Sequence, residues 1–409
     1  MTKFTKSLLF SSALLSTSAY AGEPEVGTTS TPEVTPVTET KYVDFSVNAR
    51  LRVESREAGS ADQSTAGTFR IRPGITLLPD SPISLFAESE HTYAFIDDYA
   101  SGPGAISPNV ANNTQILDPE TNELNQLYLT YKAEGFSAKV GRQRIVLDNA
   151  AFIGNVGWRQ NEQTYDAATL GYKFKGFSLS YSYANQANRI FGSDATGVAK
   201  ELEGDMHFIN VSKAIGDVTL GAYGYLLDFD EAGANAFANR ASGNTYGAYA
   251  KYKGLHLEYA EQRDASGSDL DRESNYAHVY YGTKIDTVSV KVGAEYLDQQ
   301  FYTPLATVHA FNGFADAFIG QRLGLADGTG ITEFYGSVGT KVGKVAVTGF
   351  AHYYFDDSMS QDFGWELDLV AATPLTDYAK LVTKVAYYDG GFAADDDITQ
   401  LSAQVDFNF

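Results

Sequence analysis

The chain has 409 residues, a formal net charge of −21 and no cysteine. The acidic excess argues against nucleic acid as a partner, because binding to nucleic acid rests on neutralising phosphates. No apolar run beyond the N-terminal region approaches the ~20 residues that a membrane-spanning helix needs, which excludes an α-helical membrane protein.

The first 21 residues are expected to be a cleaved export signal. Lys3 and Lys6 form a basic start, SLLFSSALLSTS is a short apolar core, and Ala19-Tyr20-Ala21 fits a small-x-small cleavage site. Without the two lysines of this leader the formal charge becomes −23. Residues 22–41 are rich in Thr, Pro and Glu, which predicts a disordered periplasmic tail ahead of a folded domain at 42–409.

The folded domain begins with the stretch DFSVNARLRVES, which alternates apolar and polar residues. A period of two predicts a β-strand with one apolar and one polar face. Similar stretches follow without helical periodicity up to the C-terminus. The 18 predicted strands cover residues 42–56, 67–78, 82–97, 123–133, 136–147, 163–174, 177–189, 203–214, 217–229, 243–252, 255–264, 274–285, 288–299, 331–342, 345–356, 362–373, 378–389 and 397–409.

The connections between these strands alternate in length. Short turns occur at AEG, FKG, IGD, YKG, KID and VGK, and longer polar loops cover 98–122, 148–162, 190–202, 230–242, 265–273 and 300–330. A soluble Greek-key sandwich, the competing interpretation, has irregular connections. Regular alternation with an even strand number is typical of Gram-negative outer-membrane barrels. We therefore expect an all-β fold, an 18-stranded antiparallel up-and-down transmembrane β-barrel, monomeric and with both termini in the periplasm.

The last stretch, ITQLSAQVDFNF, keeps the alternation and ends on Phe409. We expect the barrel assembly machinery to recognise this strand, which would then pair with the first strand and remove both edges. Tyrosine and phenylalanine gather near strand ends, as in SYSYAN and AHYYFDD, where girdles would contact lipid and lipopolysaccharide. The ordinary β propensity of aromatic residues is the alternative explanation.

Cationic residues occupy the polar faces of the early strands. An arginine facing lipid near the midplane costs ~2–4 kcal/mol, so we expect Arg50 and Arg52 to face a water-filled lumen. Arg142 and Arg144 need a bulge at Gly141 to reach the same side. The predicted pore-lining residues are Arg50, Arg52, Arg70, Arg72, Lys132, Lys139, Arg142, Arg144, Trp158, Arg159 and Lys173.

The loop at 148–162 and its flanks combine arginines with apolar residues such as Phe152 and Trp158, which predicts that it folds into the barrel and narrows it. Here the sequence resembles the alginate export family of outer-membrane barrels. The resemblance rests on Gly141-Arg142-Gln143, Ile153-Gly154, Trp158-Arg159 and Tyr165-Asp166-Ala167, in that order.

The resemblance implies an 18-stranded channel that passes anionic uronate polymers or oligomers through an electropositive constriction. By the same resemblance, Arg142, Arg144 and Arg159 would help to form that constriction. Ala151 stands where many relatives carry a basic residue, which loosens the constriction or its charge.

The expected function is passage of anionic solutes, with uronate oligosaccharides favoured and uptake as the direction. A general porin, whose lumen cations merely solvate the wall, is the alternative. An enzyme is not expected, because the six histidines are interpreted as scattered, without a His-x-Glu-type metal spacing, and no Gly-x-Ser-x-Gly motif occurs. An adhesion barrel is a further alternative. No cofactor is expected, although acidic loop runs such as Asp395-Asp396-Asp397 are candidates for calcium.

Overall fold

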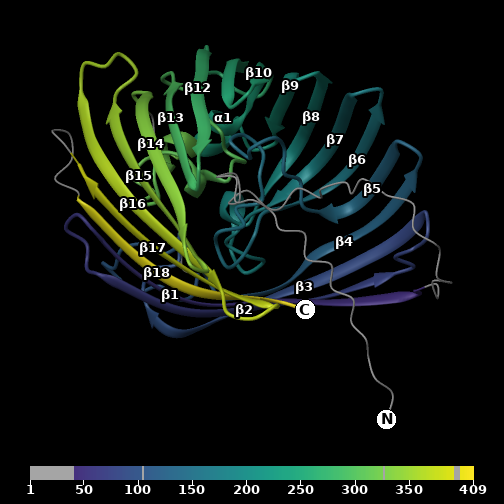
Figure 1. Cartoon of the computed structure of the whole chain (residues 1–409), viewed down its shortest axis with the longest axis horizontal. Coiled ribbons are helices and arrows are strands. Elements are labelled where there is room, and N and C mark those ends of the chain that lie inside the picture. The colour runs from purple at the N-terminus through teal and green to yellow at the C-terminus, as the bar shows by residue number, and fades with distance from the viewer. Residues whose placement is uncertain (1–40, 104–105, 326–327, 391–396) are drawn as a thin grey trace.

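A computed structural model describes residues 41–103, 106–325, 328–390 and 397–409 (Figure 1). The expected signal peptide and, apart from Lys41, the expected tail lie outside the described residues. So do Asp395 and Asp396 of the acidic run that was a candidate for calcium.

Strands dominate the described chain, and each overlaps one of the predicted strands. They are β1 (Val43–Ala58), β2 (Ser64–Leu77), β3 (Ile83–Asp98), β4 (Thr121–Ala133), β5 (Phe136–Gln143), β6 (Thr164–Phe174), β7 (Phe177–Asn188), β8 (Glu201–Ile215), β9 (Val218–Phe229), β10 (Gly243–Tyr252), β11 (Leu255–Asp264), β12 (Glu273–Ile285), β13 (Val288–Leu297), β14 (Ile331–Val342), β15 (Val345–Phe355), β16 (Asp362–Pro374), β17 (Ala379–Asp389) and β18 (Ile398–Asn408).

The helical segments are short and lie in the longer loops. They are η1 (Gly197–Ala199), α1 (Ala236–Ala241), η2 (Val308–Ala310) and α2 (Ile319–Leu323). None of the helices in the described ranges has the length and apolar character that crossing a membrane requires.

The sheet closes on itself. Each strand pairs with its neighbours in sequence, and β1 also pairs with β18, so that the 18 strands form a ring (Figure 1). All of these pairings are antiparallel; at the closure, for example, Arg50 lies opposite Asp406. Closure satisfies the backbone of both terminal strands and leaves no edge exposed. The predicted 18-stranded antiparallel barrel is confirmed.

Alternation along each strand separates two faces of the wall. On β1, Leu51 and Val53 are each 43% exposed on the outside, whereas Arg52 between them is 1% exposed. The ladders carry this alternation from strand to strand, because directly opposed residues share a face. Lys139 of β5, for instance, lies opposite Thr130 of β4 and Thr169 of β6.

One rim of the barrel carries the short turns and the other carries the long loops, as the sequence predicts. Three of the long loops, residues 99–120, 144–163 and 298–330, contribute side chains to the barrel interior. Inside the ring, Ile153 forms an isolated parallel bridge with Leu305, whose carbonyl accepts a 2.8 Å bond from Gly154 N. A Cβ at Gly154 would lie 2.2 Å from Thr307 Oγ1, so this close approach of the two loops requires glycine.

The loop after β5 packs against the far wall through Phe152. Its ring lies 5.3 Å from that of Tyr223 on β9 and 5.1 Å from that of Tyr276 on β12. The expected inward folding of this loop is therefore seen in its contacts.

Candidate lumen site

The five arginines of β1 and β2 project into the barrel, and Arg56 among them donates a 2.6 Å bond to the carbonyl oxygen of Ala315. Arg50 lies opposite Arg70 in the β1–β2 register, and Arg72 lies opposite Asn48. Arg70 is 1% exposed and Arg72 5% exposed, so these side chains are covered by other parts of the protein rather than by open water.

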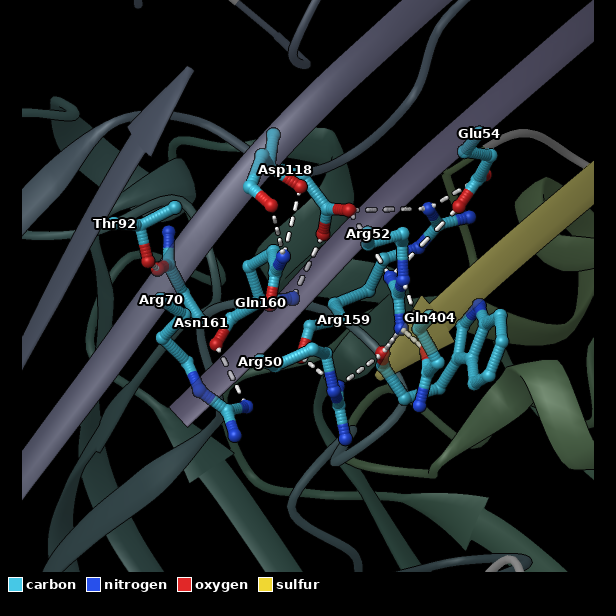
Figure 2. Close-up of polar contacts among 12 residues, drawn as sticks. Arg50, Arg52, Glu54, Arg70, Thr92, Asp118, Arg159, Gln160, Asn161 and Gln404 are labelled. Atoms are coloured by element: carbon cyan, nitrogen blue, oxygen red, sulfur yellow. Dashed lines mark hydrogen bonds and ion pairs between the residues drawn. The ribbon is translucent and has the colours of Figure 1, made fainter. Parts of the chain in front are cut away.

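Arg50 and Arg52 are bound to the backbone of the loop between β5 and β6 (Figure 2). Arg50 Nη1 donates to the carbonyl oxygens of Gly157, Trp158 and Arg159 at 3.2, 2.8 and 3.2 Å. Arg52 Nη2 donates to the carbonyl oxygen of Trp158. A guanidinium presents several donors in a fixed plane, which suits it to hold successive carbonyls.

Arg70 and Arg72 extend this attachment to the next loop residue. Their Nη1 and Nη2 atoms donate to the carbonyl oxygen of Gln160 at 3.2 and 3.1 Å. Arg72 also pairs with Glu90 on the neighbouring strand and lies 3.5 Å from Glu162 of the loop. Two strands of the wall thus hold residues 157–160 of the loop by their main chain.

Arg159 attaches the same loop to carboxylates. Its Nη1 lies 3.0 Å from Glu54 Oε1, and its Nη2 lies 3.2 Å from Asp316 Oδ2 in the loop before β14. Asp118, from the loop before β4, lies 3.9 Å away and also accepts a 2.8 Å bond from Gln160 N. Arg159 is 3% exposed, so this network joins three loops in the interior of the barrel.

Trp158 is enclosed by cations and an imidazole. The guanidinium carbon of Arg52 lies 4.1 Å from the ring centroid, and Lys384 Nζ of β17 lies 3.6 Å from it. The His309 ring stacks on Trp158 at 4.8 Å with an interplanar angle of 6°. Burial lowers the pKa of His309 to about 3, so the stacked imidazole is neutral at pH 7. Cation–π contacts of this kind are strongest where water is excluded.

Arg144 reaches the interior by a different route from the predicted one. The strand β5 ends at Gln143, and the chain then leaves the sheet. Arg144 lies 2.5 Å from Glu162 and 2.7 Å from Glu88 of β3. Its side chain is 35% exposed, whereas those of Glu162 and Glu88 are 1% and 7% exposed.

The predicted bulge at Gly141 is absent, and this corrects the placement of Arg142. The β4–β5 and β5–β6 ladders keep their register through Gly141, and Arg142 lies opposite Leu127, which is 43% exposed on the outer face. Arg142 forms hydrogen bonds of 2.7 and 2.9 Å with Asp166. Simple alternation therefore turns Arg142 outward near the long-loop rim, where a paired arginine costs little.

The carboxylates that hold the loops are strongly biased towards ionisation. Burial acts to raise the pKa of Glu162, but the guanidinium groups of Arg144 and Arg72 outweigh it and hold that pKa far below its ordinary range. In the same way, burial is outweighed at Asp118 by Arg52 and Arg159, so the pKa of Asp118 is lowered. The pKa of Asp316 is also lowered against the effect of burial, by the hydrogen bond with His309 and by the charge of Arg159.

The predicted lumen cations therefore separate into two groups. Arg50, Arg52, Arg70, Arg72 and Arg159, with Trp158, hold the loop at 144–163, and their donors are directed at protein atoms. This differs from the expected role, in which the guanidinium groups lined an open, water-filled lumen. By contrast, Lys132, Lys139, Arg144 and Lys173 share the inner face and are partly or fully exposed.

Near the short-turn rim, the inner face carries six lysines, of which the sequence predicted two, Lys132 and Lys173, as pore-lining. The second-to-last residue of β4, β6, β10, β12 and β14 and the second residue of β17 are all lysine. Each lysine is an even number of residues away from the buried, inward-facing residues of its strand and therefore also faces inward. Lys251, for example, lies opposite Thr219 and His256. We call these six residues the lysine collar: Lys132, Lys173, Lys251, Lys284, Lys341 and Lys380.

Apart from Lys251, which is half-buried, the collar lysines are exposed. Among described strand residues within two positions of the strand ends at this rim, two carboxylates, Asp44 and Asp406, share the inner face. Asp44 pairs with Lys41, and Asp406 lies 2.6 Å from Arg50. The short-turn end of the lumen is therefore cationic, although the whole chain is acidic.

These features define an outer-membrane-type barrel with loops folded into its interior. The family model described as alginate export matches residues 41–183, which confirms the resemblance that the motifs between Gly141 and Ala167 indicate. No curated protein sequence matches the chain.

Solved outer-membrane proteins share the fold. OccAB2 of Acinetobacter baumannii is 13% identical, with a TM-score of 0.66, and the alignment covers 90% of this chain and 98% of that one. OccK9 (OpdG) of Pseudomonas aeruginosa is 14% identical, with a TM-score of 0.65 and the same coverage of 90% and 98%. OpdK of Pseudomonas aeruginosa is 10% identical, with a TM-score of 0.64 and coverage of 90% and 99%. At these identities the likeness concerns the fold.

Proposed function

We propose that the protein is a monomeric outer-membrane channel for the uptake of anionic solutes, with uronate (alginate-type) oligosaccharides as the favoured class. In this proposal the short-turn rim and both termini face the periplasm, the long loops face outward, and the barrel assembly machinery recognises the strand that ends at Phe409.

The observation that carries this proposal is the lysine collar. Six lysines on six strands surround the periplasmic end of the lumen, and the two inward carboxylates at that rim already have cationic partners. Exposed charges in water are screened beyond about 8 Å at physiological salt, but charges that line a confined lumen are screened less. The collar therefore attracts anions that have passed the acidic outer loops.

The in-folded loop supplies the selective element in this proposal. Its anchors hold residues 157–160 across the interior and so narrow the path that a solute can take. Beside it, the side chain of Arg144 is 35% exposed, whereas its partners Glu88 and Glu162 are buried. A solute at the constriction thus meets Arg144 rather than its two carboxylate partners. Arginine favours carboxylates through planar two-pronged contacts.

The uronate class is supported by the resemblance to the alginate export family at 41–183. Tyrosine rings accompany the cations of the opposite wall: Lys251 Nζ lies 4.6 Å from the Tyr249 ring, and Lys291 Nζ lies 4.9 Å from the Tyr280 ring. Flat rings beside cations suit cyclic carboxylates in general. OpdK, which shares the fold, was solved with vanillate, so small ring carboxylates are the second class to try.

Reversal potentials in planar bilayers under a salt gradient test the role of the collar. Wild type should prefer anions. Replacing Lys132, Lys173, Lys284 and Lys341 with Gln should remove much of that preference, because these side chains face the lumen. The matched control replaces Lys175, Lys213, Lys253 and Lys344, which lie in the short turns or on the outer face, and changes the net charge equally.

The two variants separate local from global effects of charge. A loss of anion preference in the collar variant but not in the control variant supports the proposal. An equal loss in both variants would assign selectivity to net charge rather than to the collar. A cation preference in wild type would leave the protein as a general diffusion porin without anionic specificity.

A further inference from the structure

Three side chains with metal-ligating atoms converge on the inner wall formed by β11 and β12. His256 and Glu258 lie two residues apart on the inner face of β11, and His278 of β12 lies directly opposite Glu258. This His-x-Glu spacing corrects the expectation that the histidines have none. One ligand atom from each residue can be chosen such that all three lie within 4.8 Å of one another. Two residues of a strand and one of its neighbour are thus held together by the ladder itself.

Two buried nitrogens in this cluster have no partner. His256 is 4% exposed and His278 is 7% exposed, and the Nδ1 atom of each lacks a hydrogen bond. A buried polar atom without a partner costs about 1–3 kcal/mol, and native proteins rarely keep two of them side by side. The β-wall alone therefore does not account for these imidazoles.

Neighbouring tyrosines orient the other atoms of the cluster. His278 Nε2 lies 2.9 Å from Tyr335 Oη, which leaves the Nδ1 atom of His278 available. Tyr223 Oη donates to Glu258 Oε1 at 2.8 Å, while Glu258 Oε2 lies 2.9 Å from His256 Nε2. Outer contacts of this kind are what fix imidazole and carboxylate ligands in metal sites.

We propose that His256, Glu258 and His278 bind a divalent transition-metal ion, with Zn²⁺ as the representative, on the lumen wall. Two imidazoles and one carboxylate form a ligand set that favours Zn²⁺, Ni²⁺ or Cu²⁺ over Mg²⁺ and Ca²⁺, which prefer oxygen. Ligands of a tetrahedral zinc ion lie roughly 3.3 Å apart, since each bond is about 2.0–2.2 Å long. Small rotations of the three side chains close the remaining gap.

Charged residues of both signs surround this cluster on the neighbouring strands. Glu295 of β13 lies opposite His278, and Glu333 of β14 lies opposite Glu295, so carboxylates continue around the wall at the same level. Arg322 neutralises Glu295 at 2.8 Å, and Lys251 stands opposite His256. Glu258 is the carboxylate that faces both imidazoles, and it supplies the charge that the ion needs.

Calorimetric titration of the purified, chelator-treated barrel in detergent tests this proposal. We expect one Zn²⁺ per barrel and no comparable response to Mg²⁺. His278→Gln and His256→Gln should each weaken Zn²⁺ binding by at least about 100-fold, and Tyr335→Phe, which keeps all three ligands, by about 10-fold. His207→Gln is the matched control, because His207 projects from the outer face of β8.

Heat-modifiable migration on gels establishes whether each variant is folded. If a histidine variant does not fold, Tyr335→Phe still tests the proposal, because it keeps all three ligands. Absence of Zn²⁺ binding to the folded wild type would overturn the proposal. So would an unchanged affinity in the folded histidine variants. Metal binding is measured without a membrane, so its failure is distinct from a failure of the proposed anion transport.

Discussion

Arginine in this lumen acts mainly on the protein's own backbone. Arg50 and Arg52 direct their donors to carbonyl oxygens of residues 157–159, and Arg52 also covers the face of Trp158. A backbone carbonyl buried inside the barrel needs a hydrogen-bond donor. An arginine on a strand of the barrel supplies that donor at a fixed position along the barrel axis. At the scale of single residues, the arginines therefore set where the loop lies.

Trp158→Ala tests this arrangement at one side chain. The substitution removes a ring that is 6% exposed and is enclosed by Arg52, Lys384 and His309. We expect a loss of about 3–5 kcal/mol from the stability of the loop anchorage, as for other buried tryptophans. Single-channel recording should show a larger and noisier conductance.

Trp365→Ala is the control for that measurement. The chain has two tryptophans, and Trp365 lies between the inward residues Gly364 and Glu366, so it belongs to the outer face of β16. Its removal should leave the conductance unchanged. An unaltered conductance in Trp158→Ala would mean that the ring does not hold the loop at the constriction.

At the scale of elements, the loop at 144–163 behaves as a plug that is held by ion pairs. Glu162 ties it to Arg144 and Arg72, and Arg159 ties it to Asp316 of a second loop. The pKa values of Glu162 and Asp316 are both lowered by these cations against the effect of burial. A carboxylate with a depressed pKa stabilises the closed arrangement only while it is ionised.

The sign of the pH dependence follows from those shifts. In a released loop the carboxylates would titrate near pH ~4, and in the anchored loop they titrate lower. Their contribution is therefore complete above about pH 5 and is lost as the pH falls through the lowered values. We expect conductance to increase when the pH is taken from 7 to about 3.

Deleting Asn149 to Val156 provides the comparison for the acid experiment. Without these residues the loop cannot span the interior, so conductance should be high at neutral pH and should change little on acidification. A wild-type conductance that is independent of pH, or a deletion variant with unchanged conductance, would place the loop outside the conducting path.

At the scale of the whole molecule, the barrel could be predicted because each strand repeats one physical constraint. A strand that separates lipid from water must alternate apolar and polar residues. This alternation predicted every strand from β1 to β18. Alternation also predicted correctly that Arg142 points outward unless a bulge intervenes. The bulge at Gly141 was inferred in order to place Arg142 and Arg144 in the lumen with the other cations, and the register shows that alternation holds.

The partners of the lumen arginines could not be predicted from the same pattern. Periodicity gives the direction of a side chain, but Arg50 meets residues 157–159 only because the loop folds back, and the stretch has no repeat that fixes its path. The lysine collar was predictable, since TYKAEG, GYKFKG, AKYKG, GTKID and GTKVGK each place lysine one residue before a strand end.

The account as a whole predicts a channel that admits anionic oligosaccharides from the long-loop side. Loop anchors set the width, and the collar sets the charge at the exit. A uronate chain should therefore enter, pause at several weak sites and leave.

The most direct test is interruption of the single-channel current by a short uronate oligomer added on the long-loop side, compared with a neutral oligosaccharide of the same length. We predict brief, voltage-dependent blocks by the uronate, with a frequency that rises with its concentration and falls in the collar variant, and few blocks by the neutral chain. Equal blocking by both oligosaccharides, or none by the uronate, would contradict the proposed selectivity.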